Sequence, residues 1–282
     1  MCLFMEVSGM ATEAMCPSWR IPDGLWRRME PFLPKYHKSP KGGRPRLELR
    51  KMVDGIFYVL RTGCQWKATP AEFGSGSSLH RYFEELARRG VFRRLRKYLL
   101  RRYDQLRGIQ WKWQSLDGAT TKAPLGGEKT GKNPTDRGKL GVKRSVLTDG
   151  RGVPLGVAIG GANVHDQKLF DATLDSIPVR RPRSTARKRQ HLCCDKGFDA
   201  ETIRRNAKRR RYPPHIKSRG EEQSETRKRG RLARRWVVER IASWINRFRR
   251  LVVRWEKKTV NFLALLHLAF AYATWRQTRV LE

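Results

Sequence analysis

Residues 109–118 read IQWKWQSLDG, and the hydrophobic pattern of the chain changes at this stretch. Ile109, Trp111 and Trp113 alternate with polar residues, which is the period of a β-strand, and the strand is expected to end at the carboxylate of Asp117. Before residue 108 the apolar residues recur at helical spacing instead. The sequence therefore predicts a helical segment followed by an α/β domain.

The second part of the chain predicts a mixed sheet with helices on it. Residues 143–147 and 153–159 form a pair of strands joined by a turn, and residues 190–194 form an apolar strand that ends at Asp195. A short strand is expected at 214–216, with helices at 163–177, 199–211 and 231–250. The apolar run 262–275 is too short to span a bilayer and predicts a buried helix.

The first part of the chain predicts a small helical module. A helix capped by Asp23 is expected to close at Pro34, and three amphipathic helices follow from residues 47, 77 or 78, and 91. The last three resemble a helix-turn-helix module, in which His80, Arg81, Glu84 and Arg88 would face a DNA groove. An ordinary bundle with a solvated charged face remains the alternative. The expected domains are a disordered leader over 1–18, a DNA-binding domain over 19–107 and a catalytic domain over 108–282.

The charge of the chain points to a nucleic-acid partner. The 282 residues hold 62 Lys and Arg against 26 Asp and Glu, a net charge of +36. Such a chain repels itself unless a polyanion is bound, and arginine matches phosphate geometry better than a membrane anchor requires. We therefore expect DNA or RNA as the partner, and no membrane.

The five cysteines are an odd number without metal-ligand spacing, so they indicate reduced thiols in a cytoplasmic protein. With DNA as its partner, we expect this protein at the nucleoid. A glycine-rich loop places Gly126, Gly131 and Lys132 at the spacing of a phosphate-binding loop. Asn133 and Pro134 follow where that motif needs a hydroxyl and a helix, so a flexible basic flap is the better interpretation.

Three acids stand apart in this basic chain. Asp117 and Asp195 follow apolar strands, and Glu239 is the single carboxylate in the helical stretch 231–250, RLARRWVVERIASWINRFRR. Each has an ordinary alternative, as a turn residue for the aspartates and as an ion pair with Arg235 for Glu239. If the three converge they would need a divalent cation, and oxygen ligands select Mg²⁺ or Mn²⁺. Two such ions can activate an attacking water or hydroxyl and stabilise the leaving oxygen of a phosphodiester.

Several segments together resemble a known family. LRTGCQWKATPAEFG, LDGATTKAP, ANVHD, HLCCDKGFD and RWVVERIASWINRFRRLVVRWEKK are similar to those of bacterial insertion-sequence transposases of the DDE type, in the large family usually numbered five. The likeness covers about residues 19 to 275. It implies an RNase H-like catalytic core and assigns the catalytic, metal-binding triad to Asp117, Asp195 and Glu239. It also implies that Asn163, His165 and Asp166 support the site; for the last two, a packed histidine and a helix cap are the alternative.

The likeness departs from the family at one helix. A Tyr, Arg, Glu, Lys signature is expected there, and Arg235 and Glu239 fit it. Leu232 and Asn246 occupy the Tyr and Lys positions, and Arg247 or Arg249 would take over the phosphate contact.

The expected activity is that of a transposase that binds its terminal inverted repeats, cleaves the DNA ends and joins the 3′ hydroxyls to target DNA, using two Mg²⁺ or Mn²⁺ ions. A homodimer would hold the two ends. A DNA-binding repressor without catalysis is the rival, and an RNA-binding protein is a third alternative that lacks the expected aromatic motif. The residues expected to hold the DNA backbone are Lys143, Arg144, Arg235, Arg240 and Arg247.

Overall fold

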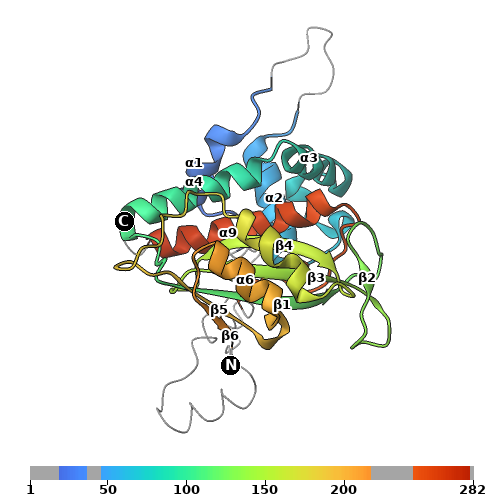
Figure 1. Cartoon of the computed structure of the whole chain (residues 1–282). Coiled ribbons are helices and arrows are strands. Elements are labelled where there is room, and N and C mark those ends of the chain that lie inside the picture. Colours follow the sequence, from blue (N-terminus) through green and yellow to red (C-terminus); the bar gives the residue numbers. More distant parts are fainter. Residues whose placement is uncertain (1–18, 37–45, 217–243, 280–282) are drawn as a thin grey trace, which may run out of the picture.

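A computed structural model describes residues 19–36, 46–216 and 244–279, apart from the side chains of Lys196 and Arg279. The predicted leader therefore lies outside the described residues. In the described part, the helices of the first hundred residues precede a six-stranded mixed sheet, and a long C-terminal helix closes the chain (Figure 1).

The N-terminal helices are α1 (Asp23–Met29), α2 (Leu49–Thr62), α3 (Gly76–Arg88) and α4 (Val91–Arg107), with the 3-10 turns η2 (Glu30–Phe32), η3 (Trp66–Ala68) and η4 (Ala71–Phe73) between them. The predicted cap of the first helix was wrong, whereas α3 begins within one residue of its expected start. Asp23 is the first residue of α1 and makes no cap, because Pro22 holds the N-cap position. Ser75 caps α3, and its side chain accepts a hydrogen bond from the Ser78 backbone.

Intramolecular contacts occupy part of the α3 surface that we expected to face DNA. His80 lies over Trp66, with the ring centroids 5.1 Å apart, and Glu84 accepts a hydrogen bond from Lys258 at 2.9 Å. Arg81 and Arg88 remain exposed. The acid that would repel a phosphate on this surface is therefore paired with a lysine.

The sheet is built on β1 (Trp113–Lys122). Its antiparallel partner is β3 (Leu140–Thr148), which also pairs with β4 (Pro154–Gly161) and with the two-residue β2 (Gly131–Lys132). On its other side β1 pairs in parallel with β5 (His191–Cys194), and β5 pairs in parallel with β6 (Pro214–Ile216). This is the mixed sheet expected for an RNase H-like core. The predicted hairpin is confirmed, and its turn is held by Asp149, which accepts from the backbone of Arg151 and Val153.

The first strand differs from its prediction at both ends. It begins at Trp113 and continues for five residues beyond Asp117, because β3 pairs with it as far as Lys122. Pairing with β5 stops at Leu116. Gly131 and Lys132 lie in β2 instead of in a wholly flexible flap, and no helix follows them, which agrees with the rejection of a phosphate-binding loop.

Helices cover both faces of the sheet. The short elements η5 (Asp166–Leu169) and α5 (Phe170–Asp175) contact one face, where Thr173 donates to Ser145 of β3 at 2.8 Å. The other face packs on α9 (Thr259–Arg279), and Val146, Val157 and Phe262 belong to one apolar cluster. The remaining elements are η6 (Lys196–Phe198) and α6 (Glu201–Arg209), which follow β5, and η7 (Arg249–Leu251).

The apolar core is continuous between the N-terminal helices and the sheet. Figure 1 places α9 between them, beside α4. Arg96 of α4 is buried there and donates to the Leu155 carbonyl of β4 at 2.6 Å. Its other nitrogen lies 3.2 Å from His267 of α9. Burial lowers the pKa of His267 well below its usual range, so its neutral ring can accept the hydrogen bond.

The predicted helix 231–250 is described only from residue 244, and its C-terminal end was wrong. After Ile245 the chain turns, and Phe248 has extended dihedrals of φ −88° and ψ 92°. The ring of Phe248 packs at 6.4 Å from that of Phe57. The chain then passes so close to Gly63 of the N-terminal part that an added Cβ there would lie 2.9 Å from the Cβ of Arg249.

A buried ion pair holds this crossing in place. Arg250 donates to Glu256 at 2.8 Å and to the Cys64 carbonyl at 3.1 Å, and its side chain and that of Glu256 are 7% and 2% exposed. Two residues before Glu256, the backbone of Arg254 donates to the Lys122 carbonyl at the end of β1. The segment 249–256 thus connects the N-terminal helices to the central strand.

We expect Glu256→Ala to lower the free energy of unfolding by about 3–5 kcal/mol, because it leaves the Arg250 cation buried without its partner. Chemical denaturation measures this loss. The exposed Glu30→Gln serves as the control and should change stability by less than about 0.5 kcal/mol. Equal effects of the two substitutions would contradict the structural role of the pair.

Candidate functional site

Asp117 and Asp195 come from neighbouring parallel strands. The last paired residues of β1 and β5 are Leu116 and Cys194, and each aspartate is the next residue of its chain. Parallel strands lie about 4.8 Å apart, and residues in register point to the same face of the sheet. The register therefore brings the two carboxylates side by side, although they are 78 positions apart in the sequence (195 − 117 = 78).

Burial and the charges of both carboxylates raise the pKa of one thiol, that of Cys194. Burial raises the pKa of Cys194 above its usual range, and the charges of Cys193, Asp195 and Asp117 raise it further. Cys194 is therefore a neutral thiol in the apolar layer beneath the two aspartates. It adds no third anion there, and the two aspartates themselves are only half-buried.

Asp166 lies against Gly118 and Gly197, the glycines that closely follow the two aspartates. Its Oδ2 accepts an ion-pair hydrogen bond from Lys143 Nζ at 3.1 Å, while its buried Oδ1 has no hydrogen-bond partner. Oδ1 lies so close to the Cα of Gly118 that a side chain at Gly118 would overlap it. An added Cβ on Gly197 would lie 3.2 Å from Oδ2. Asp166 thus contacts the residue after Asp117 and the second residue after Asp195.

The other two supporting residues lie apart from Asp166. The side chain of Asn163 is exposed and packs over Gly131 and Gly161, where it fills the space that a Cβ would need. His165 is exposed and occupies the N-cap of η5 without a side-chain cap, so it is neither a packed histidine nor a cap through its ring. Asn163 therefore connects the β2 loop to the end of β4.

The described basic residues expected at DNA have different surroundings. Lys143 is paired with Asp166, and its side chain is 13% exposed. Arg144 is buried and donates to the Leu251 carbonyl at 3.2 Å; burial lowers its pKa to about 10, which keeps it a cation at neutral pH. Arg247 is exposed, as is Asn246 at the position where lysine was expected. Glu239, Arg235, Arg240 and Leu232 lie outside the described residues.

The donor set suits a hard divalent cation. Two half-buried carboxylates lie together, and oxygen donors of this kind select Mg²⁺ or Mn²⁺. Within residues 19–36, 46–216 and 244–279, no group of three or more His, Cys, Asp or Glu side chains is placed to hold a metal. Glu239, the third predicted ligand, lies outside these ranges.

Two functional glycines were missed by the reasoning from sequence. Gly118 and Gly197 follow the aspartates closely, and each leaves room for Asp166. The signal was present as Asp-Gly and Asp-Lys-Gly, but glycine after a strand also marks an ordinary turn. The close approach that requires these glycines appears only when Asp166 is brought to them.

Comparisons with known proteins agree on one family. A model of the "Transposase DDE domain" matches residues 113–274, which is more than half of the chain, and a model of candidate transposases of the IS4/5 family matches residues 21–96. A candidate transposase for insertion sequence element IS402 of Burkholderia cepacia is 36% identical over 156 residues, covering 55% of this chain and 72% of that protein.

Two further proteins are similar in part. An uncharacterised 16.2 kDa protein of insertion element IS402 of Burkholderia cepacia is 33% identical over 118 residues, covering 40% of this chain and 80% of that protein. Among solved structures, a pre-cleavage Mos1 transpososome is 11% identical with a TM-score of 0.27, covering 86% of this chain and 81% of that chain. None of the described helices is long and apolar enough to cross a membrane.

We expect Gly118→Ala to destabilise the protein by about 1–3 kcal/mol, because the new methyl group overlaps the Asp166 carboxylate. In an Asp166→Ala background the same substitution should cost less, since the overlapping atoms are gone. Chemical denaturation of the four proteins measures the coupling. Additive losses would show that Gly118 and Asp166 do not meet.

Proposed function

Because the chain belongs to the family of DDE-domain transposases of bacterial insertion sequences, we propose that it binds the terminal inverted repeats of its own element, cleaves the DNA ends and joins the 3′ hydroxyls to target DNA. The observation that carries the proposal is the register of β1 and β5. It brings Asp117 and Asp195 together in a strongly basic protein.

In this proposal Asp117, Asp195 and Glu239 form the catalytic triad and hold two Mg²⁺ or Mn²⁺ ions. The bound ions would activate the attacking oxygen and stabilise the leaving oxygen of the phosphodiester. The protein itself holds the carboxylates of Asp117 and Asp195 in position. Gly118 contributes by donating its backbone N–H to Asp117 Oδ1 at 2.8 Å, which orients that carboxylate.

Asp166 acts in the proposal as a positioning residue. Through Gly118 and Gly197 it sets the spacing of the segments that carry Asp117 and Asp195. Lys143 balances its charge, so Lys143 serves the site from behind and is not a surface clamp. Asn163 packs against Gly131 of β2 and Gly161 at the end of β4. His165 is the N-cap of η5, whose first residue is Asp166.

The arginines that were expected to contact phosphates fall into an exposed group and a buried one. Arg247 is exposed and, with Arg235 and Arg240, is proposed to hold the DNA backbone. Arg144 is buried, so we assign it to holding the chain at Leu251 under the sheet. We also propose that residues 19–107 recognise the DNA ends, that residues 108–282 carry the chemistry, and that a homodimer in the cytoplasm holds two ends at the nucleoid.

A repressor derived from a transposase is the competing proposal. It would bind the DNA ends without cutting them, and it predicts a gel shift with no metal-dependent nicking. The two adjacent aspartates favour the enzyme, because a protein that only binds DNA gains nothing from placing two anions next to its phosphate-binding surface.

We expect Asp195→Asn and Asp117→Asn each to lower Mg²⁺-dependent nicking of an end-containing duplex by a factor of about 10³ or more, since each removes a metal ligand. Glu239→Gln should do the same. Asp23→Asn, whose side chain is 80% exposed on α1, is the matched control. Nicking at the parental rate by a folded Asp195→Asn protein would refute the assignment.

We expect Asp166→Asn to reduce nicking by about 10- to 100-fold and to raise the Mg²⁺ concentration needed for half-maximal rate, as loss of an outer carboxylate does at other metal sites. The metal titration separates positioning from mere stability. Asp171→Asn, in α5, removes a similar ion pair with Arg210 away from the aspartates and is the control. The same half-maximal Mg²⁺ concentration in both variants would contradict the role of Asp166.

A further inference from the structure

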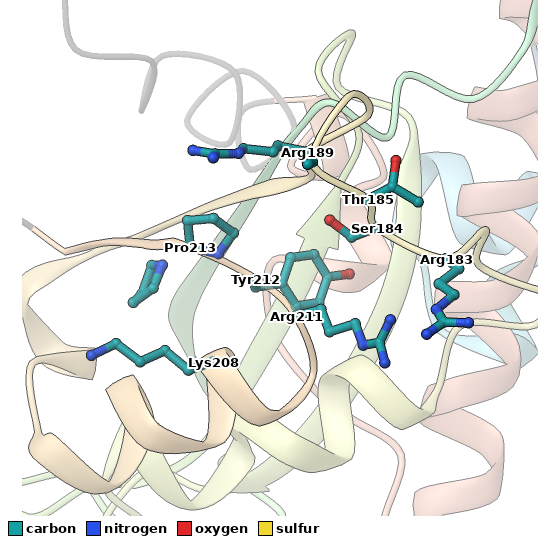
Figure 2. Close-up of a pocket in the computed structure, with 10 residues that line it drawn as sticks. Arg183, Ser184, Thr185, Arg189, Lys208, Arg211, Tyr212 and Pro213 are labelled. Carbon is teal, nitrogen blue, oxygen red and sulfur yellow. The ribbon is translucent and has the colours of Figure 1, made fainter.

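A basic groove lies near the end of β5 that is farthest from Asp195. It has a volume of about 790 Å³ and is formed by the loop before β5, the end of α6 and the residues leading into β6. We call it the Tyr212 groove (Figure 2). Its main lining residues are Arg183, Arg189, Lys208, Arg211, Tyr212 and Pro213.

The four cationic side chains of the Tyr212 groove have no acidic partner in the part of the chain that the structure describes. All four are exposed, and among the described residues their side chains make no ion pair. Neighbouring arginines differ, because Arg210 pairs with Asp171 and Asp175, and Arg204 pairs with Asp199. Among the described residues, no acid lines the groove. Its charge is therefore left for a ligand.

Arg211 has a backbone conformation that favours glycine. Its φ is +59°, and the hydrogen bonds from Arg211 N to Lys208 O and from Tyr212 N to Ala207 O close the end of α6 as a Schellman motif. Glycine is the usual residue at this position, and the backbone of a residue with a Cβ is strained there. An exposed arginine in this place lowers stability, which suggests that its side chain is kept for a function.

Tyr212 forms the floor of the groove, and contacts with Arg181 and Gln114 hold it in place. The guanidinium of Arg181 lies 3.4 Å from the centre of the Tyr212 ring, and Arg181 also donates to the Arg210 carbonyl at 2.8 Å. The Tyr212 hydroxyl donates to Gln114 of β1 at 2.8 Å. In the loop, Ser184 accepts from the backbone of Gln190. Figure 2 shows Arg183, on the loop, and Arg211 on one side of Tyr212, while Arg189 and Lys208 extend to the other side.

The chemistry of the groove fits phosphate groups and not bases. Tyr212 is 1% exposed, so its ring cannot stack on a base. Guanidinium and ammonium groups without acids bind phosphodiesters independently of sequence. From His191 to Asp195 the chain advances four residues, or about 13 Å at the rise of a strand. One DNA strand spaces its phosphates by about 3.4 Å, so a single duplex can reach both places.

We infer that the Tyr212 groove is a second contact with the DNA backbone, which holds duplex DNA about four phosphates from the cleavage site. The inference rests on the proposed function, because it takes DNA as the partner. The groove adds affinity without sequence preference. It also keeps the duplex in line with the sheet while Asp117 and Asp195 act at the other end.

The test measures binding of the full chain to a fluorescent duplex of mixed sequence, about 30 base pairs long, by anisotropy across a series of KCl concentrations. EDTA is present so that no cleavage can occur. The triple variant Arg183→Gln, Lys208→Gln, Arg211→Gly should bind about tenfold or more weakly near 0.1 M salt. Its plot of log affinity against log salt should be flatter by about 0.9 for each phosphate that the variant no longer neutralises.

Arg211→Gly alone separates function from folding. It should raise the thermal unfolding midpoint, because glycine relieves the left-handed backbone, and should still weaken DNA binding. Arg276→Gln, which removes an exposed charge from α9, is the matched control and should bind like the parent. If Arg211→Gly, which removes one charge like this control, has the affinity and salt slope of the control, the inference is wrong.

Failure of the inference is distinguishable from failure of the proposed function. Binding in EDTA is measured without cleavage, so it does not depend on the catalytic step. Absence of nicking by the parent protein would refute the transposase mechanism whatever the binding results. Unchanged binding by the triple variant would refute the groove even if nicking is normal.

Discussion

The structure depends on the central strand β1 having different partners on its two sides. Antiparallel pairing with β3 extends to Lys122, whereas parallel pairing with β5 ends at Leu116. Beyond the end of β5, β1 continues, still paired with β3. The last residue pair between β1 and β5 is Leu116 with Cys194, and the next residue of each chain segment is Asp117 and Asp195. Two anions are thus placed together by backbone hydrogen bonds, without any attraction between their side chains. The repulsion between them is the feature that a cation would relieve.

Around this point the protein uses buried charge for structure and exposed charge for its partner. Arg96, Arg144 and Arg250 are buried and bind carbonyl groups or a carboxylate of distant segments. These contacts join the N-terminal helices, the sheet and α9 into one core. Many other cations of the described residues are exposed, and the net charge of +36 of the chain favours a polyanion. A high arginine content therefore serves two physically different purposes, and burial separates them.

At the site, the absence of a side chain on certain glycines is as important as the charges of the acidic and basic residues. Gly118, Gly131 and Gly197 each lie where a neighbouring Asp166 or Asn163 needs the volume of a Cβ. At Arg211 the opposite holds, because a side chain is present where the backbone conformation favours glycine. Both cases concern the fit between one residue and a partner distant in sequence. They explain why residue types that look ordinary along the chain acquire a role in the folded protein.

The sequence by itself determined the class of the fold, the order of helices and strands, the family and the two strand aspartates, because periodicity, charge and motif spacing are local properties. The strand at 214–216 and the hairpin near Asp149 were found in this way. Only the tertiary structure decided that β1 continues past Asp117, that Asp166 lies behind both aspartates, that Lys143 and Arg144 are turned inward, and that the helix containing Trp244 stops before Phe248. Each of these depends on contacts between segments far apart in the chain, and no local pattern encodes which segments will meet.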